Sequence, residues 1–340
     1  MKVSILITTY NLENYIGQTL ECVCNQDYDD YEILIGDDGS ADATVDIVKQ
    51  YMQQYPGLIE LYVMPREQGA DYNRVERASA NRINLLRHAA GEYITFLDGD
   101  DLYTSKSRIT IMVKALETHK DCIMAAHNLI MYYGGDEITG PPLVRARRSH
   151  RWSVYDYWPC TFIQSNAIMF RRNDEALKAL YGNASLLTGF DDNNITFWLF
   201  MYGDMYYIPD SLGAYRQTPE SSWNGIDELK RYASHIVGYN VEQSIVEGSG
   251  AERKRSLERL IDVRHRQDLQ YMYVNGSRLR SEDLEPFYHT AKSSRLKTAQ
   301  DIFDANEAAL KECHRKYRST AMPYLYARFK RLILKLIKRY

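Results

Sequence analysis

The 340-residue sequence lacks the features that identify several large classes of protein. It has no run of about 18 consecutive apolar residues, and its N-terminal apolar run is too short for a signal peptide, so we expect a cytoplasmic protein that does not span a membrane. Its five cysteines are odd in number and include no C-x-x-C pair, which predicts reduced thiols and no zinc site. No G-x-G-x-x-G follows the first strand-like run, as a dinucleotide dehydrogenase would require.

Net charge is also small, at −3, which gives no indication of a nucleic-acid-binding protein. The charge is unevenly distributed, however. Residues 311–340 hold ten Lys or Arg and one Glu, a local charge of +9, so residues 1–310 carry −12. A chain of 340 residues can form one substantial core and a smaller second unit.

The sequence does contain a short apolar strand that ends in three carboxylates. Residues 94–101 read ITFLDGDD, so Asp98, Asp100 and Asp101 crowd at one strand end. Carboxylates this close repel one another unless a cation lies between them, and Mn²⁺ or Mg²⁺ prefers one or two such oxygens together with phosphate oxygens. An isolated D-x-D is also typical of a solvated acidic turn.

A second acidic cluster follows the apolar run at residues 32–35, where the sequence continues GDDGSADAT. The chain also begins with such a run, VSILI at residues 3–7, followed by TTYN. These strand–loop–helix units all have polar strand exits. In open parallel α/β sheets, ligands bind outside the carboxyl ends of the strands. We therefore expect a nucleotide and metal site where the three exits meet.

Residues 2–101 resemble the donor-binding half of family 2 glycosyltransferases, of the bacterial surface-polysaccharide type. Three segments carry the resemblance, in the family's order and spacing: SILITTYN, DDGSADAT and GEYITFLDGDD, which begin at residues 4, 37 and 91. The resemblance fades by about residue 225. It implies the α/β GT-A fold, a Rossmann-like and mostly parallel mixed sheet flanked by helices, with a helical C-terminal extension.

The resemblance implies a site for Mn²⁺ or Mg²⁺ at the D-x-D segment. Asp100 is expected to be the direct metal ligand, and Asp98 a second ligand or a contact to the ribose. Asp101 is expected to support the loop or the ligands. His127 is a further candidate ligand, although a buried structural histidine explains it more simply.

The resemblance also assigns four residues to the nucleoside of a UDP-sugar: Thr8, Tyr10, Asp38 and Arg77. Asp38 can accept the imide N–H of uracil, and Tyr10 can stack on the ring. Arg77 lies fourteen residues before the glycine of GEYITFLDGDD, where the family often has an arginine. Arg74 and Arg82 are alternatives at this position.

The base that deprotonates the acceptor hydroxyl is expected in residues 189–198, which read GFDDNNITFW. This segment resembles the family's acidic pair ahead of an aromatic helix, with Asp where Glu is usual and a slightly longer spacing. We favour Asp192 over Asp191 as the base. Either carboxylate could instead cap the helix that follows.

The pattern predicts three parts of the chain. Residues 1–225 form the GT-A domain, and residues 226–321, which become charged, helical in pattern and poor in glycine, form a helical C-terminal region. Residues 322–340 form a basic amphipathic tail helix. Within the first part, residues 134–152 contain Gly-Gly, Pro-Pro and several arginines and predict a loop.

The tail has one apolar helical face, made by Leu325, Phe329, Leu332, Ile333, Leu336 and Tyr340. Basic residues occupy most of the remaining surface. Such a helix is held at an anionic membrane surface by apolar burial and by about 1 kcal/mol for each basic residue near the lipid. We expect peripheral docking at the inner face of the plasma membrane; a helix packed on its own domain would not explain the charge.

These observations predict a metal-dependent glycosyltransferase that uses a UDP-sugar and a glycan or lipid-linked glycan acceptor, and the resemblance implies inversion at the sugar. A non-catalytic nucleotide-sugar-binding scaffold is disfavoured because every acidic position that the chemistry needs is filled. A haloacid-dehalogenase-type phosphatase would have Thr or Val at the position of Leu102, and it would leave the segment DDGS unexplained.

Overall fold

The protein is described here from a computed structural model. The structure describes residues 2–67, 72–135, 137–144, 146–157, 163–217 and 228–261, with the first part of the last range as backbone only. By their contacts, residues 1–225 and 240–260 form one compact unit, and residues 226–239 and 261–340 form a second. The predicted tail at 322–340 and most of the predicted helical region at 226–321 lie outside the described residues.

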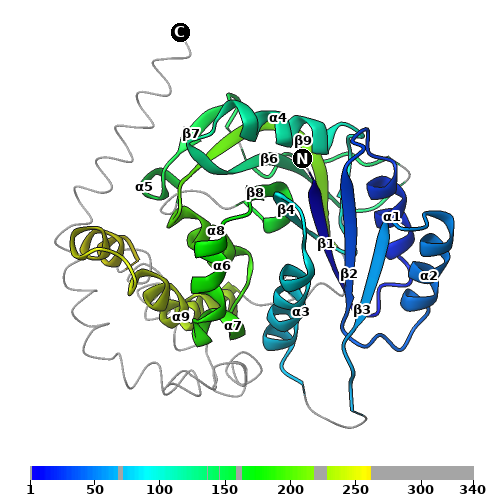
Figure 1. Cartoon of the computed structure of the whole chain (residues 1–340), viewed down its shortest axis with the longest axis horizontal. Helices are drawn as coiled ribbons and strands as arrows, with labels where there is room; N and C mark the ends of the chain where they lie inside the picture. The colour runs from blue at the N-terminus through cyan, green and yellow to red at the C-terminus, as the bar shows by residue number, and fades with distance from the viewer. Residues whose placement is uncertain are drawn as a thin grey trace. The chain divides into compact units, whose positions relative to one another are not determined.

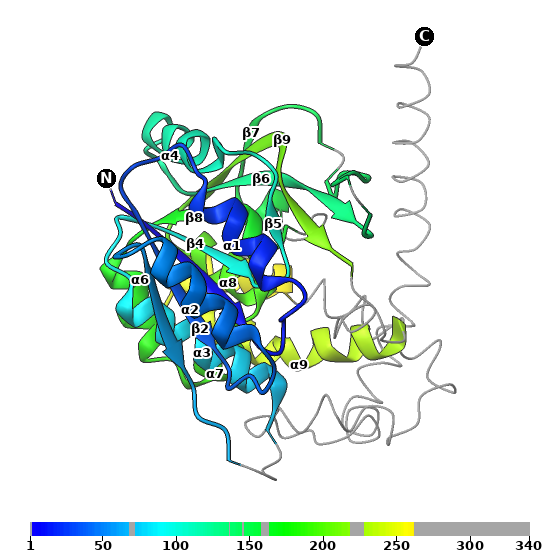
Figure 2. The same cartoon turned by 90° about the vertical axis from the view of Figure 1, so that its right-hand side faces the viewer.

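One mixed sheet lies at the centre of the first unit (Figures 1 and 2). Its strands run in the order β3-β2-β1-β4-β8-β6-β9-β5, and β7 pairs with β9. The strands are β1 (Val3–Thr9), β2 (Tyr31–Asp37), β3 (Ile59–Val63), β4 (Tyr93–Asp98), β5 (Leu102–Tyr103), β6 (Cys122–Tyr132), β7 (His150–Trp152), β8 (Ile168–Arg171) and β9 (Asp204–Arg216). The first four are mutually parallel, whereas β8 runs antiparallel to β4 and β6. The expected mixed α/β sheet flanked by helices is confirmed.

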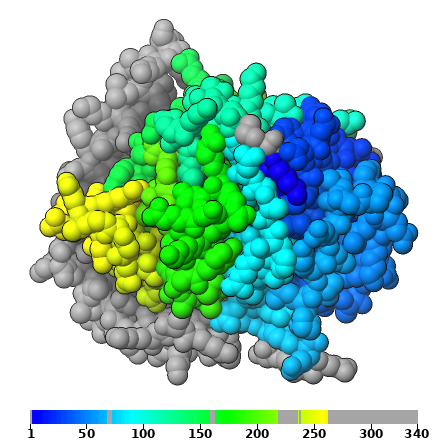
Figure 3. Space-filling view, in the orientation of Figure 1, coloured from blue at the N-terminus to red at the C-terminus, as the bar shows by residue number. Residues whose placement is uncertain are grey.

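Helices cover both faces of the sheet. The helices of this unit are α1 (Ile16–Cys24), α2 (Thr44–Gln54), α3 (Arg74–His88), α4 (Arg108–Thr118), α5 (Val154–Tyr157), α6 (Asp174–Tyr181), α7 (Ala184–Thr188) and α8 (Asp192–Phe200). A further helix, α9 (Glu228–Val246), includes residues of both units. Figure 1 shows α1 and α2 on one side of β1–β3 and α3 on the other. In the space-filling view of Figure 3, α3 lies against the segment that carries α6–α8, and α3 and α7 are in contact.

The alternation of side chains along β1 builds a core on each face. Val3, Ile5 and Ile7 are fully buried in a cluster with apolar residues of α1, α2 and α4. The opposite face of the sheet holds an aromatic cluster, in which Phe96 and Phe170 lie 6.1 Å apart and Trp198 meets Phe170 edge to face. Strands buried on both faces explain the nearly continuous apolar runs in the sequence.

Strand register brings the polar exits together at one edge of the sheet. Thr8 of β1 lies opposite Asp98 of β4, and Thr9 lies opposite Asp37 of β2. Because the three strands are parallel, their carboxyl ends meet at this edge, as the sequence predicts.

Helix α3 is fixed tightly on this part of the sheet. Its first turn is capped by Asn73, whose side chain accepts the backbone N–H groups of Val75 and Glu76 at 3.0 and 3.2 Å. In its middle, Asn81 donates to the Gly36 carbonyl of β2 at 2.8 Å. A Cβ atom at Gly36 would lie 1.9 Å from the Asn81 side chain, so only glycine allows this approach.

Part of the predicted loop at 134–152 is a strand. Residues 150–152 form β7 and pair antiparallel with β9, and Ile130 forms an isolated bridge with Pro142. A strand of three residues is too short to show an alternating pattern in the sequence, and the Gly-Gly and Pro-Pro pairs before it indicate a loop. The loop prediction was therefore wrong for residues 150–152. Among the residues that the structure describes, no helix is long and apolar enough to cross a membrane.

Candidate active site

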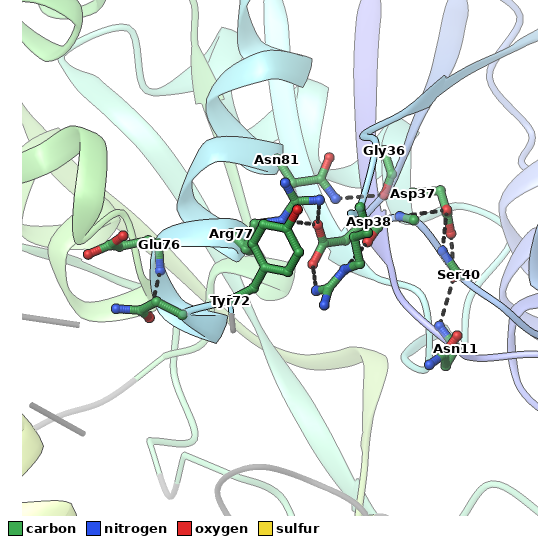
Figure 4. A network of polar contacts seen from close by, with 12 residues as sticks. Asn11, Gly36, Asp37, Asp38, Ser40, Tyr72, Glu76, Arg77 and Asn81 are labelled. Carbon is green, nitrogen blue, oxygen red and sulfur yellow. Dashed lines mark hydrogen bonds and ion pairs between the residues drawn. The ribbon is translucent and has the colours of Figure 1, made fainter. Parts of the chain in front are cut away.

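Hydrogen bonds connect the loops that follow β1 and β2 (Figure 4). Asn11 adopts a left-handed backbone with φ of 51°, which Asn tolerates better than most residues. Its side chain accepts the Ala41 N–H at 2.9 Å, and its own N–H donates to Ser40 Oγ at 2.8 Å. Asp37 is fully buried and accepts the N–H groups of Gly39 and Ser40. Asp37 therefore shapes the loop and leaves Asp38 to face α3.

Asp38 is the centre of what we call the Asp38 cluster, which consists of Asp38, Arg66, Arg77, Tyr10 and Tyr72. Arg77 Nε donates to Asp38 Oδ1 at 2.6 Å, and Arg66 pairs with Oδ2 at 2.5 Å. The Arg66 guanidinium also lies 4.0 Å from the centre of the Tyr10 ring, and Arg77 lies 4.8 Å from the Tyr72 ring. The cluster thus combines one carboxylate, two guanidinium groups and two aromatic faces.

These groups suit a nucleobase. An ionised carboxylate accepts imide or amide N–H groups, and aromatic and guanidinium planes stack on a base. Tyr10 is 41% exposed, so its ring can be reached from solvent. Arg66 covers one face of that ring.

The β4 exit is organised by Asp101, which is fully buried. Its carboxylate accepts the backbone N–H of Arg216 at 2.8 Å and a hydrogen bond from the Asn166 amide. Arg216 in turn donates to the Asp100 carbonyl at 2.7 Å, and Thr19 donates to the Asp101 carbonyl at 2.9 Å. Burial raises the pKa of Asp101 well above its ordinary value, with a further contribution from Asp100. Asp101 therefore fixes the loop that presents the other two carboxylates.

Asp98 and Asp100 face the sheet edge. Thr8 Oγ1 donates to Asp98 Oδ1 at 3.0 Å, and Arg82 Nη2 pairs with the same oxygen at 3.1 Å. Burial, followed by the charge of Asp98, raises the pKa of Asp100 to about 6. The charge of Asp98 disfavours the ionisation of Asp100, and a proton or a cation at Asp100 would relieve that repulsion.

Arg82 connects this pair to the second acidic segment. Its Nη2 atom lies 3.1 Å from Asp98 Oδ1 and 3.7 Å from Asp192 Oδ1, an arrangement that we call the Arg82 bridge. Ser165 Oγ also donates to Asp192 Oδ1. Burial raises the pKa of Asp192, and Arg82 opposes that shift.

Asp191 has a different role in the local structure. It is the N-cap of α8, and its Oδ1 accepts the Asn194 N–H at 2.9 Å. Burial is the main cause that raises the pKa of Asp191 to about 6, and Asp192 adds to the shift. Just before it, the Phe190 N–H donates to Ser79 Oγ of α3 at 2.9 Å, which holds the acidic segment against that helix.

The residues at the β4 exit fit a divalent cation only in part. Within the described ranges, no group of three or more His, Cys, Asp or Glu side chains is arranged as a metal site. Asp98 and Asp100 supply two hard oxygen ligands, which is what Mg²⁺ or Mn²⁺ takes from a protein when phosphate oxygens and water complete its shell. His127 does not contribute, because it is fully buried and accepts a hydrogen bond from Arg108 at 2.9 Å.

Of the eight site residues predicted from the sequence, Tyr10, Asp38, Arg77, Asp98 and Asp192 lie in these two clusters, and Thr8 bonds to Asp98. The Asp191 side chain caps α8 instead, and Asp100 interacts with the Arg82 bridge only through the charge of Asp98. Four contacting residues were missed or given another role, and one of them is Tyr72. Arg66 follows β3 and belongs to no motif, although the parallel pairing of β3 with β2 could have placed it. Arg82 was considered only as an alternative to Arg77, and Ser165 lies in a 3₁₀ turn without a sequence signal.

Known proteins show which family and fold the chain shares. The family model described as "Glycosyl transferase family 2" matches residues 4–177. The GalNAc(5)-diNAcBac-PP-undecaprenol beta-1,3-glucosyltransferase of Campylobacter jejuni is 26% identical over 220 residues, which are 63% of this chain and 64% of that protein.

Two solved structures share the fold. S. aureus TarS (residues 1–349), in complex with UDP-GlcNAc, superposes with a TM-score of 0.57 at 17% identity, over 85% of this chain and 79% of that one. The mannosyltransferase PcManGT from Pyrobaculum calidifontis, in complex with GDP-Man and Mn²⁺, superposes with a TM-score of 0.53 at 18% identity, over 97% of this chain and 86% of that one.

Proposed function

The chain belongs to glycosyl transferase family 2 and is a glycosyltransferase with the GT-A fold, and on that premise we propose that it transfers a sugar from a UDP-sugar to a glycan or lipid-linked glycan of a surface polysaccharide. The observation that carries the proposal is the convergence of three strand exits in register, with the Asp38 cluster and the Arg82 bridge at the same sheet edge.

The Asp38 cluster would bind the nucleoside. Asp38, held by Arg66 and Arg77, would accept the imide N–H of uracil, and Tyr10 would stack on the ring. Thr8 would orient Asp98, to which it already donates at 3.0 Å, toward the ribose or the diphosphate. An acceptor-only carboxylate can accept the N3–H of uracil, whereas N3 of cytosine is itself an acceptor and carries no hydrogen.

A divalent cation would be held by Asp100 directly and by Asp98. When bound, Mn²⁺ or Mg²⁺ neutralises the charge that develops on the leaving diphosphate. The chain's own residues keep the two carboxylates in place: Asp101 fixes the loop, and Arg216 holds the Asp100 carbonyl. A relative solved with Mn²⁺ supports this assignment.

Asp192 would act as the base in a single displacement. The acceptor oxygen would form a bond to the anomeric carbon while the bond to the diphosphate breaks, and the hydroxyl proton would pass to the Asp192 carboxylate. One displacement inverts the anomeric centre. Asp192 is favoured over Asp191 because its carboxylate is joined through Arg82 to Asp98, whereas the Asp191 carboxylate caps α8.

The acceptor is proposed to be presented at a membrane. The Campylobacter relative is named for an acceptor linked to PP-undecaprenol. The charge of +9 in residues 311–340 and the apolar stripe of 322–340 suit an anionic surface at the inner leaflet. Removal of residues 322–340 should abolish binding to anionic liposomes while turnover on a short soluble acceptor persists; unchanged liposome binding would exclude the tail as the anchor.

The donor assignment can be tested with the purified full chain. We would measure the melting temperature with UDP-glucose, UDP-GlcNAc, UDP-galactose and GDP-mannose, each with Mn²⁺ and with EDTA, and then follow release of the nucleoside diphosphate with acceptor extracts. UDP-sugars with Mn²⁺ should raise the melting temperature by mass action. Stabilisation by GDP-mannose alone would overturn the uridine assignment, equal effects in EDTA would overturn metal dependence, and binding without turnover would indicate a scaffold.

A further inference from the structure

Arg82 does not enter the mechanism above as a binding or catalytic group, yet it contacts carboxylates on both sides of the reaction. We infer that Arg82 is a positioning residue that couples the two sides: a cation bound at Asp98 displaces Arg82 from that carboxylate and leaves it paired with Asp192, which aligns the base only when the donor site is loaded. The inference rests on the proposed function, because it assigns the cation to Asp98 and the base to Asp192.

The side chain of Arg82 is well placed for such a change of partner. It extends from the middle of α3, and it is only 11% exposed. Its Nη2 atom is 3.1 Å from Asp98 and 3.7 Å from Asp192, so the contact with Asp98 is the shorter one. Its Nη1 atom makes a long contact of 3.4 Å to the Phe190 carbonyl, and its buried Nε has no hydrogen-bond partner. The guanidinium is therefore held chiefly by its two carboxylates.

The charges around Arg82 allow Asp98 and Asp192 to share its guanidinium group. Burial works against the charged form of Arg82, but Asp98, Asp192 and Asp191 more than compensate and raise its pKa. One guanidinium thus lies among three carboxylates, and each carboxylate competes for it. Whatever neutralises one of them strengthens the pairing of Arg82 with the others.

A divalent cation at Asp98 would have that effect. Its positive charge would repel the guanidinium and weaken the pair between Arg82 Nη2 and Asp98 Oδ1. Asp192 is the nearest alternative partner, and Ser165 already fixes the same Asp192 oxygen. Because Arg82 and the cation compete for the Asp98 carboxylate and repel each other, removal of Arg82 should strengthen cation binding.

This reciprocity gives an unusual combination of effects for Arg82→Gln. We expect the dissociation constant for Mn²⁺, measured without donor from the electron paramagnetic resonance signal of free Mn²⁺, to fall by about threefold to tenfold. We expect kcat to fall roughly 100-fold because the base is no longer aligned, while the donor KM changes by less than about threefold. If Arg82 had a merely structural role, Arg82→Gln would weaken Mn²⁺ binding and donor binding as well as lower kcat.

Two further variants complete the design. Arg82→Lys keeps the charge but offers a single point donor, so it should recover roughly tenfold in kcat relative to Arg82→Gln and return the Mn²⁺ affinity toward that of the wild type. Arg87→Gln removes an exposed arginine of the same helix, which contacts the Tyr181 ring, and should leave kcat and Mn²⁺ affinity unchanged. If Arg82→Gln does not unfold cooperatively, the comparison of Arg82→Lys with the wild type carries the test, with a smaller decrease in kcat and no loss of Mn²⁺ affinity.

The outcomes separate this inference from the proposed function. Wild-type kcat in Arg82→Gln, or weaker Mn²⁺ binding together with a lower kcat, would overturn the coupling role. Failure of the wild type to release a nucleoside diphosphate from any donor would overturn the proposed function instead. In that case the Mn²⁺ titration still decides whether Arg82 competes with a cation at Asp98.

Discussion

The Asp38 cluster and the Arg82 bridge lie at the same edge of one sheet, yet their charge balances are opposite. In the first, two guanidinium groups face a single carboxylate, and both pairs are at 2.5 Å. In the second, one guanidinium is shared between Asp98 and Asp192. Asp100 and Asp191 lie close enough for the neighbouring charges to shift their pKa values. The first region therefore carries an excess of positive charge, whereas the second retains negative charge.

This difference indicates different tasks. A carboxylate whose partners are already in place is preorganised to recognise a ligand, because little rearrangement is needed on binding. Carboxylates whose pKa values are raised by burial and by one another are poised to bind a cation or to exchange a proton. We therefore expect mutations in the first region to change donor affinity and mutations in the second to change metal binding and turnover.

The largest expected effect is in the second region, at the proposed base. Asp192→Asn should lower kcat by roughly 10³-fold or more and leave donor affinity within a factor of about three, because a base acts in the chemical step. Asp191→Asn is the matched control, since Asn caps a helix as well as Asp does and the fold should be kept. Steady-state kinetics of both variants would decide; the reverse ranking would move the base to Asp191, and near-normal turnover of both would remove the segment from catalysis.

Asp100→Asn should abolish Mn²⁺-dependent donor binding with little change in melting temperature. Isothermal titration of Mn²⁺ and UDP provides the measurement, and Asp46→Asn, at an exposed position of α2, provides the control. Because the pKa of Asp100 is about 6, Mn²⁺ affinity of the wild type should fall as the pH drops below that value. Full activity of Asp100→Asn, or of the wild type in EDTA, would contradict the assignment.

Asp100 should also affect how the stability of the metal-free protein depends on pH. Its folded pKa of about 6 exceeds its unfolded value near 4, so the folded state holds the extra proton between those pH values. This carboxyl therefore contributes a decrease in the free energy of unfolding as the pH rises from about 4 to about 6. Denaturant unfolding of Asp100→Asn should lack that contribution, and an identical pH profile would show that the pKa is not raised.

A smaller effect is expected in the first region. Asp38→Asn should weaken UDP binding by roughly tenfold to 100-fold, as expected for loss of one hydrogen bond to a charged acceptor, while kcat at saturating donor stays within about threefold. Arg66→Gln should act in the same direction but less strongly, because Arg77 still holds the carboxylate. A decrease in kcat as large as that of Asp192→Asn would show that the two regions do not have separate tasks.

The smallest effect concerns the contact that fixes α3. Gly36→Ala would press a methyl group onto Asn81 and should lower the free energy of unfolding by about 1–3 kcal/mol. Gly182→Ala is the control, because a Cβ there meets its nearest neighbour at an ordinary 3.5 Å. Thermal and denaturant unfolding would measure both; equal stabilities would mean that α3 can shift to accept the methyl group.

The sequence was informative where strand ends carry motifs, and less so where contacts depend on packing between distant segments. The apolar runs and polar exits were enough to place Thr8, Asp38 and Asp98 at one edge, because parallel strands leave little choice of register. Arg82 could not be assigned in the same way. Arg77 and Arg82 both lie on α3, and only the rotation of that helix on the sheet decides which carboxylate each one meets.

Strand β7 was also beyond the sequence patterns. The three residues of β7 are recognisable only from their pairing with β9. The contact of Arg66 with Asp38 was also unpredictable, because it depends on β3 lying next to β2 and Arg66 belongs to no motif with a recognisable spacing. Such contacts are set by topology, and single-sequence periodicity carries no information on them.

Helix α3 supplies an arginine to each region, and this has a consequence for how the protein can change. Arg77 and Arg82 are five residues apart, which is about 7.5 Å along a helix axis, and Asn81 locks the helix to β2 between them. One inserted residue would rotate everything on one side of it by about 100°. The stretch should therefore accept many substitutions at its exposed positions but no change of length, since a single insertion would separate nucleotide recognition from the carboxylates that perform the chemistry.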